Sequence, residues 1–430
     1  MQKKGNLMAP LPIAVFLVIF IGMGIATSDF YAMPAIVGFL IALVIAFVQN
    51  KDLSFDEKFS ICAKSVGDEN ILIMCLVFLA AGAFSGAVGA AGGVTSTVNL
   101  GLSLMPPGVA VVGLFIIGCF ISTSMGTSVG TVTALTPIAV GISNITGFSM
   151  AICVASVVSG AMFGDNLSMI SDTTIAAVRT QGCEMKDKFK ANFLIVLPAA
   201  IATIVLYFVL TMGGTFELTE DLSYNILQVL PYILVLVGAL IGINVFVILI
   251  AGTVASLIVG VCTGNIAVMD IFSVVGGGVT SMYDITVISI VVAAIVGLVK
   301  ENGGIQYIID IIGKKAKGSK GGQLGIAALI SLVDMATANN TVAIVMAGPI
   351  AKDISDEYGI PATRSASLLD IFASVFQGLI PYGAQLLTAA ALSGLSPFDI
   401  IPYMYYPVLM AVSALLFICL GKGGKKTVLK

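Results

Sequence analysis

Twelve apolar stretches joined by short polar loops are the feature that most limits how this chain can fold. Ten of them are long enough to cross a membrane as single helices, at about residues 11–27, 31–49, 69–92, 149–178, 189–212, 226–243, 244–262, 284–300, 365–392 and 402–420. The chain is 58% hydrophobic and 10% charged, whereas about a quarter of the residues in a soluble domain are charged. These features predict an all-α polytopic membrane protein.

The two remaining apolar stretches, 109–141 and 321–350, are each interrupted by polar residues. The interruptions lie at 123–128 and at 334–341. Each stretch is either one long broken helix or a re-entrant hairpin that enters and leaves the membrane on the same side. The distribution of basic residues distinguishes these alternatives.

If both stretches are hairpins and Lys3 and Lys4 are cytoplasmic, every lysine and arginine falls on the cytoplasmic side. If both are full crossings, the loop 351–364 with Lys352 and Arg364 lies on the opposite side. The positive-inside rule therefore favours two re-entrant hairpins.

An internal repeat supports this topology. The motif Pro-Ile-Ala-x-x-Ile-Ser-x-x-x-Gly occurs at 137–147 and again, 212 residues later, at 349–359. Each half then has five transmembrane helices and one re-entrant hairpin, and an odd number of crossings inverts the second half relative to the first. We predict two inverted-topology repeats, at 1–225 with a cytoplasmic N-terminus and at 226–430 with a cytoplasmic C-terminus. This architecture is typical of secondary transporters.

The stretch 163–174 holds the strongest candidate site, because it places two acids in an otherwise apolar segment. Carboxylates at membrane depth are costly, and they mark ion or proton sites. The candidate ligands are the two acids and the polar residues around them: Asp165, Asp172, Asn166, Ser168, Ser171 and Thr173. The alternative is that Ser171 or Asp172 only caps a helix, which does not explain two acids.

We expect this stretch to converge with three other polar elements. These are the two hairpin tips and a second interrupted helix at 370–385, which contribute Ser124, Thr127, Ser128, Asn339, Asn340, Thr341, Asp370 and Gln377. The alternative for the tips is close helix packing, for which small residues are preferred. Asp334 is expected near the mouth of its hairpin and solvated, and no lysine or arginine is expected beside the buried acids.

The chain has no histidine, so proton chemistry near neutral pH must depend on carboxyl groups. It has no phosphate-binding loop of the ATPase type, and its seven cysteines show no metal-binding spacing. We therefore expect a transporter rather than an enzyme, with no cofactor and no nucleic-acid partner.

The stretch from Phe163 to Thr174 resembles the signature Gly-Asp-Lys-x-Ser-Pro-x-Ser-Asp-Thr-Thr of NhaC-type sodium/proton antiporters. Asp370, followed by Leu-Ile-Pro-Tyr-Gly at 379–383, is similar to a second motif of that family. The resemblance extends from about residue 70 to 410, with strong identity only in these two stretches. Asn166 replaces the usual lysine and Met169 the usual proline.

The resemblance implies exchange of Na⁺ for H⁺ across the bacterial inner membrane, with Asp165 and Asp172 binding Na⁺ or protons in turn. A buried carboxyl group holds a proton more readily than one in water, so proton and Na⁺ would compete. A more distant similarity to sodium-coupled dicarboxylate carriers implies a homodimer. The alternative function is a sodium-coupled transporter or exchanger of a small amino acid or organic acid, in which the hairpin N–H groups hold the solute carboxylate.

Overall fold

The computed structural model describes residues 5–27, 33–49, 51–104, 107–169, 171–212, 222–241, 243–304, 307 and 318–420. The regular structure in these ranges is helical. The helices are α1 (Leu11–Thr27), α2 (Ala35–Gln49), α3 (Phe55–Val66), α4 (Glu69–Ala90), α5 (Gly93–Leu104), α6 (Ala110–Met125), α7 (Ser128–Thr146), α8 (Met150–Leu167), α9 (Asp172–Gln181), α10 (Met185–Met212), α11 (Ile226–Leu240), α12 (Val245–Cys262), α13 (Ile271–Thr280), α14 (Tyr283–Glu301), α16 (Gly318–Thr337), α17 (Asn340–Tyr358), α18 (Ala362–Gln377), α19 (Ala384–Ser393), α20 (Pro397–Ile400) and α21 (Tyr405–Leu420).

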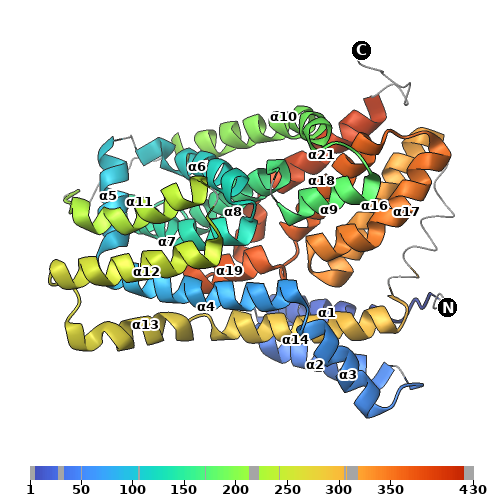
Figure 1. Ribbon diagram of the computed structural model, residues 1–430, viewed down its shortest axis with the longest axis horizontal. Helices are drawn as coiled ribbons and strands as arrows, with labels where there is room; N and C mark the ends of the chain where they lie inside the picture. Colours follow the sequence, from blue (N-terminus) through green and yellow to red (C-terminus); the bar gives the residue numbers. More distant parts are fainter. Residues whose placement is uncertain are drawn as a thin grey trace.

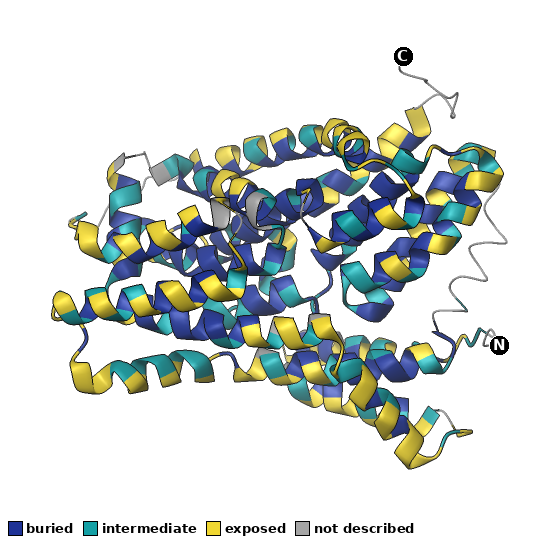
Figure 2. Cartoon of the chain, in the orientation of Figure 1, coloured by how far each residue is buried: buried dark blue, intermediate teal, exposed yellow. Residues whose placement is uncertain are grey.

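The outer faces of the helices carry large apolar side chains. Val209 on α10, Val254 on α12 and Phe272 on α13 are all exposed, and Figure 2 shows exposed residues along the outer faces of α10, α12 and α13. Extended apolar surface of this kind is stable in lipid and not in water. The prediction of a polytopic helical membrane protein is confirmed.

Five described helical segments are long and apolar enough to cross a membrane, or six if the bent pair α19–α20 counts as one span. The five are Ile71–Ala90, Ser128–Thr146, Met150–Gln181, Met185–Met212 and Val245–Cys262. One of them is α7, which the sequence assigns to a hairpin. The number of crossings, the hairpins and the inversion therefore stay predictions.

Helix boundaries recur at the spacing of the sequence repeat. α17 begins and ends 212 residues after α7, and α19 begins and ends 212 residues after α9. The C-caps correspond as well: Gly147 and Gly359 close α7 and α17, and Gly182 and Gly394 close α9 and α19. All four have positive φ, between 64° and 74°, a conformation that favours glycine.

Two groups of helices lie side by side (Figure 1). One contains α1–α4 with α12–α14, and the other contains α6–α10 with α16–α21. Within the second group α8 packs on α6 and α7, and α18 packs on α16, α17 and α9. The ends of α8, α9, α18 and α19 meet inside this group, and this arrangement brings the polar residues together.

The closest approach near these polar residues is between α6 and α8. A Cβ atom on Gly164 would lie 2.5 Å from the backbone oxygen of Cys119, and one on Gly160 would lie 2.4 Å from that of Phe115. Side chains do not fit at such distances, so glycine allows the two backbones to touch. Because Gly164 precedes Asp165, this contact also fixes where the acid lies.

Replacing Gly164 with alanine is expected to destabilise the fold by about 1–3 kcal/mol, the usual effect of overpacking. The measurement is the free energy of unfolding or the melting temperature in detergent. Gly89→Ala is the matched control, because a Cβ there meets nothing within 4 Å and alanine favours a helix. Equal stability of the two variants would contradict the close contact between α6 and α8.

Candidate ion-binding site

Asp165 lies near the end of α8, where its carboxylate is buried against hydroxyl groups. α8 ends at Leu167, and α9 begins at Asp172 after a short non-helical segment. The carboxylate accepts hydrogen bonds from Ser128 Oγ (2.8 Å) and from Ser171 Oγ (2.5 Å). Only 4% of Asp165 is exposed, so a negative charge there is costly and depends on these hydrogen-bond donors.

Ser171 occupies the N-cap position of α9, but its hydroxyl does not cap the helix. An N-cap hydroxyl accepts a hydrogen bond from an N–H of the first turn. The Ser171 hydroxyl instead donates to Asp165 and lies 2.8 Å from the hydroxyl oxygen of Thr173. Capping therefore does not explain this serine, whose side chain belongs to the surroundings of the carboxylate.

A series of hydrogen bonds joins Asp165 to the second half of the chain. Ser128, the first residue of α7, donates to Asp165 and accepts from Gln385 Nε2 at 2.9 Å. Gln377 Nε2 donates to Gln385 Oε1 at 2.9 Å and to the carbonyl oxygen of Ala338 at 3.4 Å. The structure thus brings together parts of all four polar elements that the sequence predicts to converge.

A second acid, Asp370, is fully buried in α18 and is paired with a lysine. Its Oδ2 atom accepts hydrogen bonds from Thr174 Oγ1 (3.0 Å) and from the ammonium group of Lys188. Lys188 lies in the first turn of α10 and is 1% exposed. The expectation that no basic residue lies beside the buried acids is therefore wrong.

Asn166 takes part in a neighbouring network of amides and hydroxyls. Its Oδ1 atom accepts from Asn192 Nδ2 at 3.0 Å, and its own Nδ2 lies 3.4 Å from Ser374 Oγ. Asn192 Oδ1 accepts in turn from the hydroxyl of Ser367. Lys188 and Asn192 are four residues apart on α10, so they face the same way. Neither residue is among those predicted from the sequence, although their four-residue spacing is visible in it.

Asp172 lies elsewhere than expected. It is the first residue of α9 and its side chain is exposed, whereas Asp165, Ser168, Ser171 and Thr173 are buried. Non-helical residues separate the end of α8 from the start of α9, so the two acids do not follow one continuous helical register and need not share one face.

The tips of the predicted hairpins are partly explained by capping. Thr127 and Asn339 are the N-caps of α7 and α17, and their side-chain oxygens accept from the N–H groups of Gly130 (3.4 Å) and Val342 (3.0 Å). Asn340 is buried, and its oxygen accepts from its neighbour, the half-buried Thr341, at 3.1 Å. The side chain predicted at Ser124 lies outside the described residues.

Asp334 is fully buried near the end of α16, so the expectation that it is solvated is wrong. Within the described part of the chain, neither carboxyl oxygen has a hydrogen-bond partner. A negative charge in such surroundings is costly, because no described donor stabilises it. Nearby, Ala338 has φ 51°, a strained value for a residue other than glycine.

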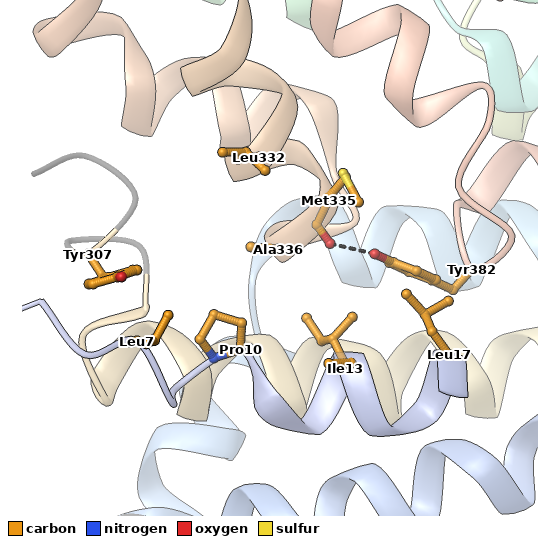
Figure 3. Close-up of a pocket in the computed structure, with 10 residues that line it drawn as sticks. Leu7, Pro10, Ile13, Leu17, Tyr307, Leu332, Met335, Ala336 and Tyr382 are labelled. Atoms are coloured by element: carbon orange, nitrogen blue, oxygen red, sulfur yellow. Dashed lines mark hydrogen bonds between the residues drawn. The ribbon is translucent and has the colours of Figure 1, made fainter. Parts of the chain in front are cut away.

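A separate cavity of about 390 Å³ lies between α1 and α16 (Figure 3). Its lining is mostly aliphatic, with Ile13, Leu17 and Leu332 among the contributing residues. The phenol of Tyr382 donates a hydrogen bond of 2.6 Å to the carbonyl oxygen of Met335 (Figure 3). No charged residue lines this cavity in the described part of the chain, and Asp165 does not border it.

The apolar outer faces and the buried polar side chains around Asp165 and Asp370 are those of a polytopic membrane protein with a polar region inside its helices. The chain belongs to the Na⁺/H⁺ antiporter family, whose model matches residues 6–212 and 221–422. Membership of an antiporter family indicates a transporter rather than an enzyme. It confirms the resemblance to NhaC-type antiporters that the motifs indicated.

Several relatives match almost the whole chain at low identity. A Na⁺/H⁺ antiporter NhaC of Alkalihalophilus pseudofirmus is 23% identical over 91% of this chain and 90% of its own. A malate-2H⁺/Na⁺-lactate antiporter of Bacillus subtilis is 22% identical over 98% and 97%. An arginine/ornithine antiporter ArcD of Halobacterium salinarum is 25% identical over 98% and 93%. The relatives thus include exchangers of inorganic ions and of organic solutes.

Proposed function

We propose that this protein exchanges Na⁺ for H⁺ across the bacterial inner membrane, with Asp165 binding the two ions in turn. The observation that carries the proposal is the set of contacts at this acid. It is buried, and the hydrogen bonds described for its carboxylate come from the hydroxyls of Ser128 and Ser171. A carboxylate held by hydroxyls is free to bind a cation, whereas one held by a basic residue is already neutralised.

Hydroxyl groups suit a site that alternates between two occupants. A serine or threonine hydroxyl is both donor and acceptor, and it rotates. It donates to an empty carboxylate, accepts from a protonated one, and offers an oxygen lone pair to a hard cation. Ser128, Ser171 and Thr173 supply such oxygens around Asp165. Na⁺ and H⁺ therefore compete for one site.

Asp172 has a different part in this proposal. Its side chain is exposed at the start of α9, directly after Ser171. A negative charge beside a site attracts cations and raises their local concentration. We infer that Asp172 binds Na⁺ on its way to Asp165 and contributes less to the final affinity.

The repeat gives a way to expose the site to each side of the membrane. The recurrence of helix boundaries at 212 residues supports two equivalent halves, and the sequence analysis predicts that they are inverted. Two inverted halves that meet at Asp165 would open alternately, one toward each side. A homodimer would provide a fixed scaffold for this movement.

The inversion can be tested with one pair of equivalent positions. Asn144 near the end of α7 and Asp356 near the end of α17 are 212 residues apart, and both are exposed. In a background in which the exposed Cys262 and Cys419 are serine, Asn144→Cys is expected to react with a membrane-impermeant thiol reagent added to intact cells. Asp356→Cys is expected to react only after permeabilisation. Labelling of both from one side would contradict the inverted repeat.

The alternative function is sodium-coupled transport or exchange of a small organic acid or amino acid. The names of the malate/lactate and arginine/ornithine relatives favour it. Against it, the buried ammonium of Lys188, the natural partner for a solute carboxylate, is already paired with Asp370. The two functions differ in whether Na⁺ alone, without organic solute, dissipates a pH gradient in vesicles.

A further inference from the structure

The ammonium of Lys188 has a hydrogen-bond acceptor for each of its N–H groups in the buried polar region around Asp165 and Asp370. It is buried, and an ammonium has three N–H groups to place. The structure provides three acceptors: the carbonyl oxygen of Asn166 (2.9 Å), the hydroxyl oxygen of Thr174 (2.9 Å) and the carboxylate of Asp370. These acceptors lie on α8, α9 and α18, so Lys188 links the interrupted helix α8–α9 to α18 in the second half of the chain.

The contact with residue 166 connects this lysine to the sequence motif. The signature that residues 163–174 resemble has a lysine at position 166, where this chain has Asn166. The Asn166 side chain bonds Asn192 and Ser374 and supplies no charge. The ammonium of Lys188 lies against the backbone oxygen of that same residue. A positive charge is thus present at this place, supplied by α10.

We propose that Lys188 is a fixed counter-ion that neutralises Asp370 and thereby leaves Asp165 as the buried acid that binds Na⁺. This rests on the proposed function and assigns Lys188 as a positioning residue that does not touch the transported ion. With the Lys188–Asp370 pair neutral, the empty site carries the charge of Asp165 alone. One Na⁺ or one proton restores neutrality.

The proposal predicts weak Na⁺ binding for the single variant Asp370→Asn and near-normal Na⁺ binding for a double variant that also removes the lysine. Asp370→Asn removes the counter-charge of Lys188. The uncompensated ammonium then lies beside the site and repels Na⁺. Lys188→Gln combined with Asp370→Asn removes both charges and keeps the net charge unchanged. If Asp370 were itself a ligand, the double variant would be as impaired as the single one. Oδ1 of Asp370, which has no partner among the described residues, is the atom such a ligand would use.

The test measures Na⁺ binding as the rise in melting temperature with increasing Na⁺ in detergent, with choline as the reference cation. We expect Asp370→Asn to raise the apparent dissociation constant for Na⁺ by at least about tenfold. The double variant is expected to return within about threefold of wild type. A double variant that folds but stays as weak as Asp370→Asn would overturn the proposal. An unchanged dissociation constant in Asp370→Asn would also overturn the proposal, because the Lys188–Asp370 pair would then have only a structural role.

A second pair of variants tests the relocation of the charge. Lys188→Asn leaves the carboxylate of Asp370 uncompensated beside the site and is expected to lower the apparent dissociation constant for Na⁺. Adding Asn166→Lys is expected to return that constant toward the wild-type value by supplying the ammonium from α8. A folded but unrestored double variant would contradict the relocation. Binding is measured without a proton gradient, so it does not depend on exchange. If wild type and variants bind Na⁺ with the predicted order of dissociation constants but wild type moves no protons, only the proposed exchange is disproved. A wild-type protein that shows no stabilisation by Na⁺ would disprove both.

Discussion

Asp165→Asn is expected to abolish Na⁺-dependent proton exchange while the protein still folds. Asparagine has nearly the shape of aspartate: its amide oxygen accepts a hydrogen bond from one of the two serine hydroxyls, and its NH₂ group donates to the other, which rotates to accept. It carries neither a negative charge nor a transferable proton, so neither ion is held. The measurements are exchange in reconstituted vesicles and the melting temperature of the purified variant.

Two further acids serve as comparisons for Asp165. Asp353→Asn changes an exposed acid on α17 that is not among the residues around Asp165, and this variant is expected to exchange at the wild-type rate. Asp172→Asn is expected to raise the half-saturating Na⁺ concentration only a few-fold, because the side chain is exposed. If Asp165→Asn exchanges as fast as Asp353→Asn, Asp165 is not the binding acid.

Ser128→Ala is expected to weaken apparent Na⁺ affinity more than any other single hydroxyl substitution around the site. The Ser128 hydroxyl contacts both Asp165 and Gln385, so its loss removes an oxygen ligand and separates the two halves of the network. Leaving a buried polar group unsatisfied costs about 1–3 kcal/mol, which corresponds to a rise in half-saturation of about fivefold to about 150-fold. The measurement is exchange rate against Na⁺ concentration at constant pH.

Thr136→Val is the matched control on the same helix. Thr136 is buried in α7, and its hydroxyl donates to the carbonyl oxygen of Val132 within the helix. We expect its half-saturation to stay within about threefold of wild type, since such an intrahelical bond contributes little. An equal loss of affinity in both variants would show that α7 has loosened and that Ser128 has no specific role.

The convergence of the polar elements could be predicted because it follows from patterns that the sequence displays directly. Polar interruptions in apolar stretches need buried partners, and the repeat shows which segments correspond. The shift that matches Asp165 to Gln377 also matches Thr127 to Asn339. In the structure the second pair forms equivalent N-caps, and Gln377 joins the network that reaches Asp165.

The charge balance of the site could not be predicted, because it depends on tertiary packing. Lys188 follows a polar loop and precedes an apolar helix, so its local sequence is that of a cytoplasmic basic residue. Its burial arises because Thr174 and Asp370 meet at that turn of α10. Asp334 is a similar case, since only the packing of α16 shows that its carboxyl group is buried away from solvent.

The most direct test of the account uses purified protein in vesicles with an imposed pH gradient and no organic solute. We expect added Na⁺ to dissipate the gradient and added choline to leave it intact. Half-saturation for Na⁺ should rise as the pH falls, because protons and Na⁺ compete for Asp165 and a higher proton concentration demands more Na⁺. If Na⁺ alone moves no protons between about pH 6 and pH 9, a range that covers the titration of buried carboxyl groups, Na⁺/H⁺ exchange is contradicted.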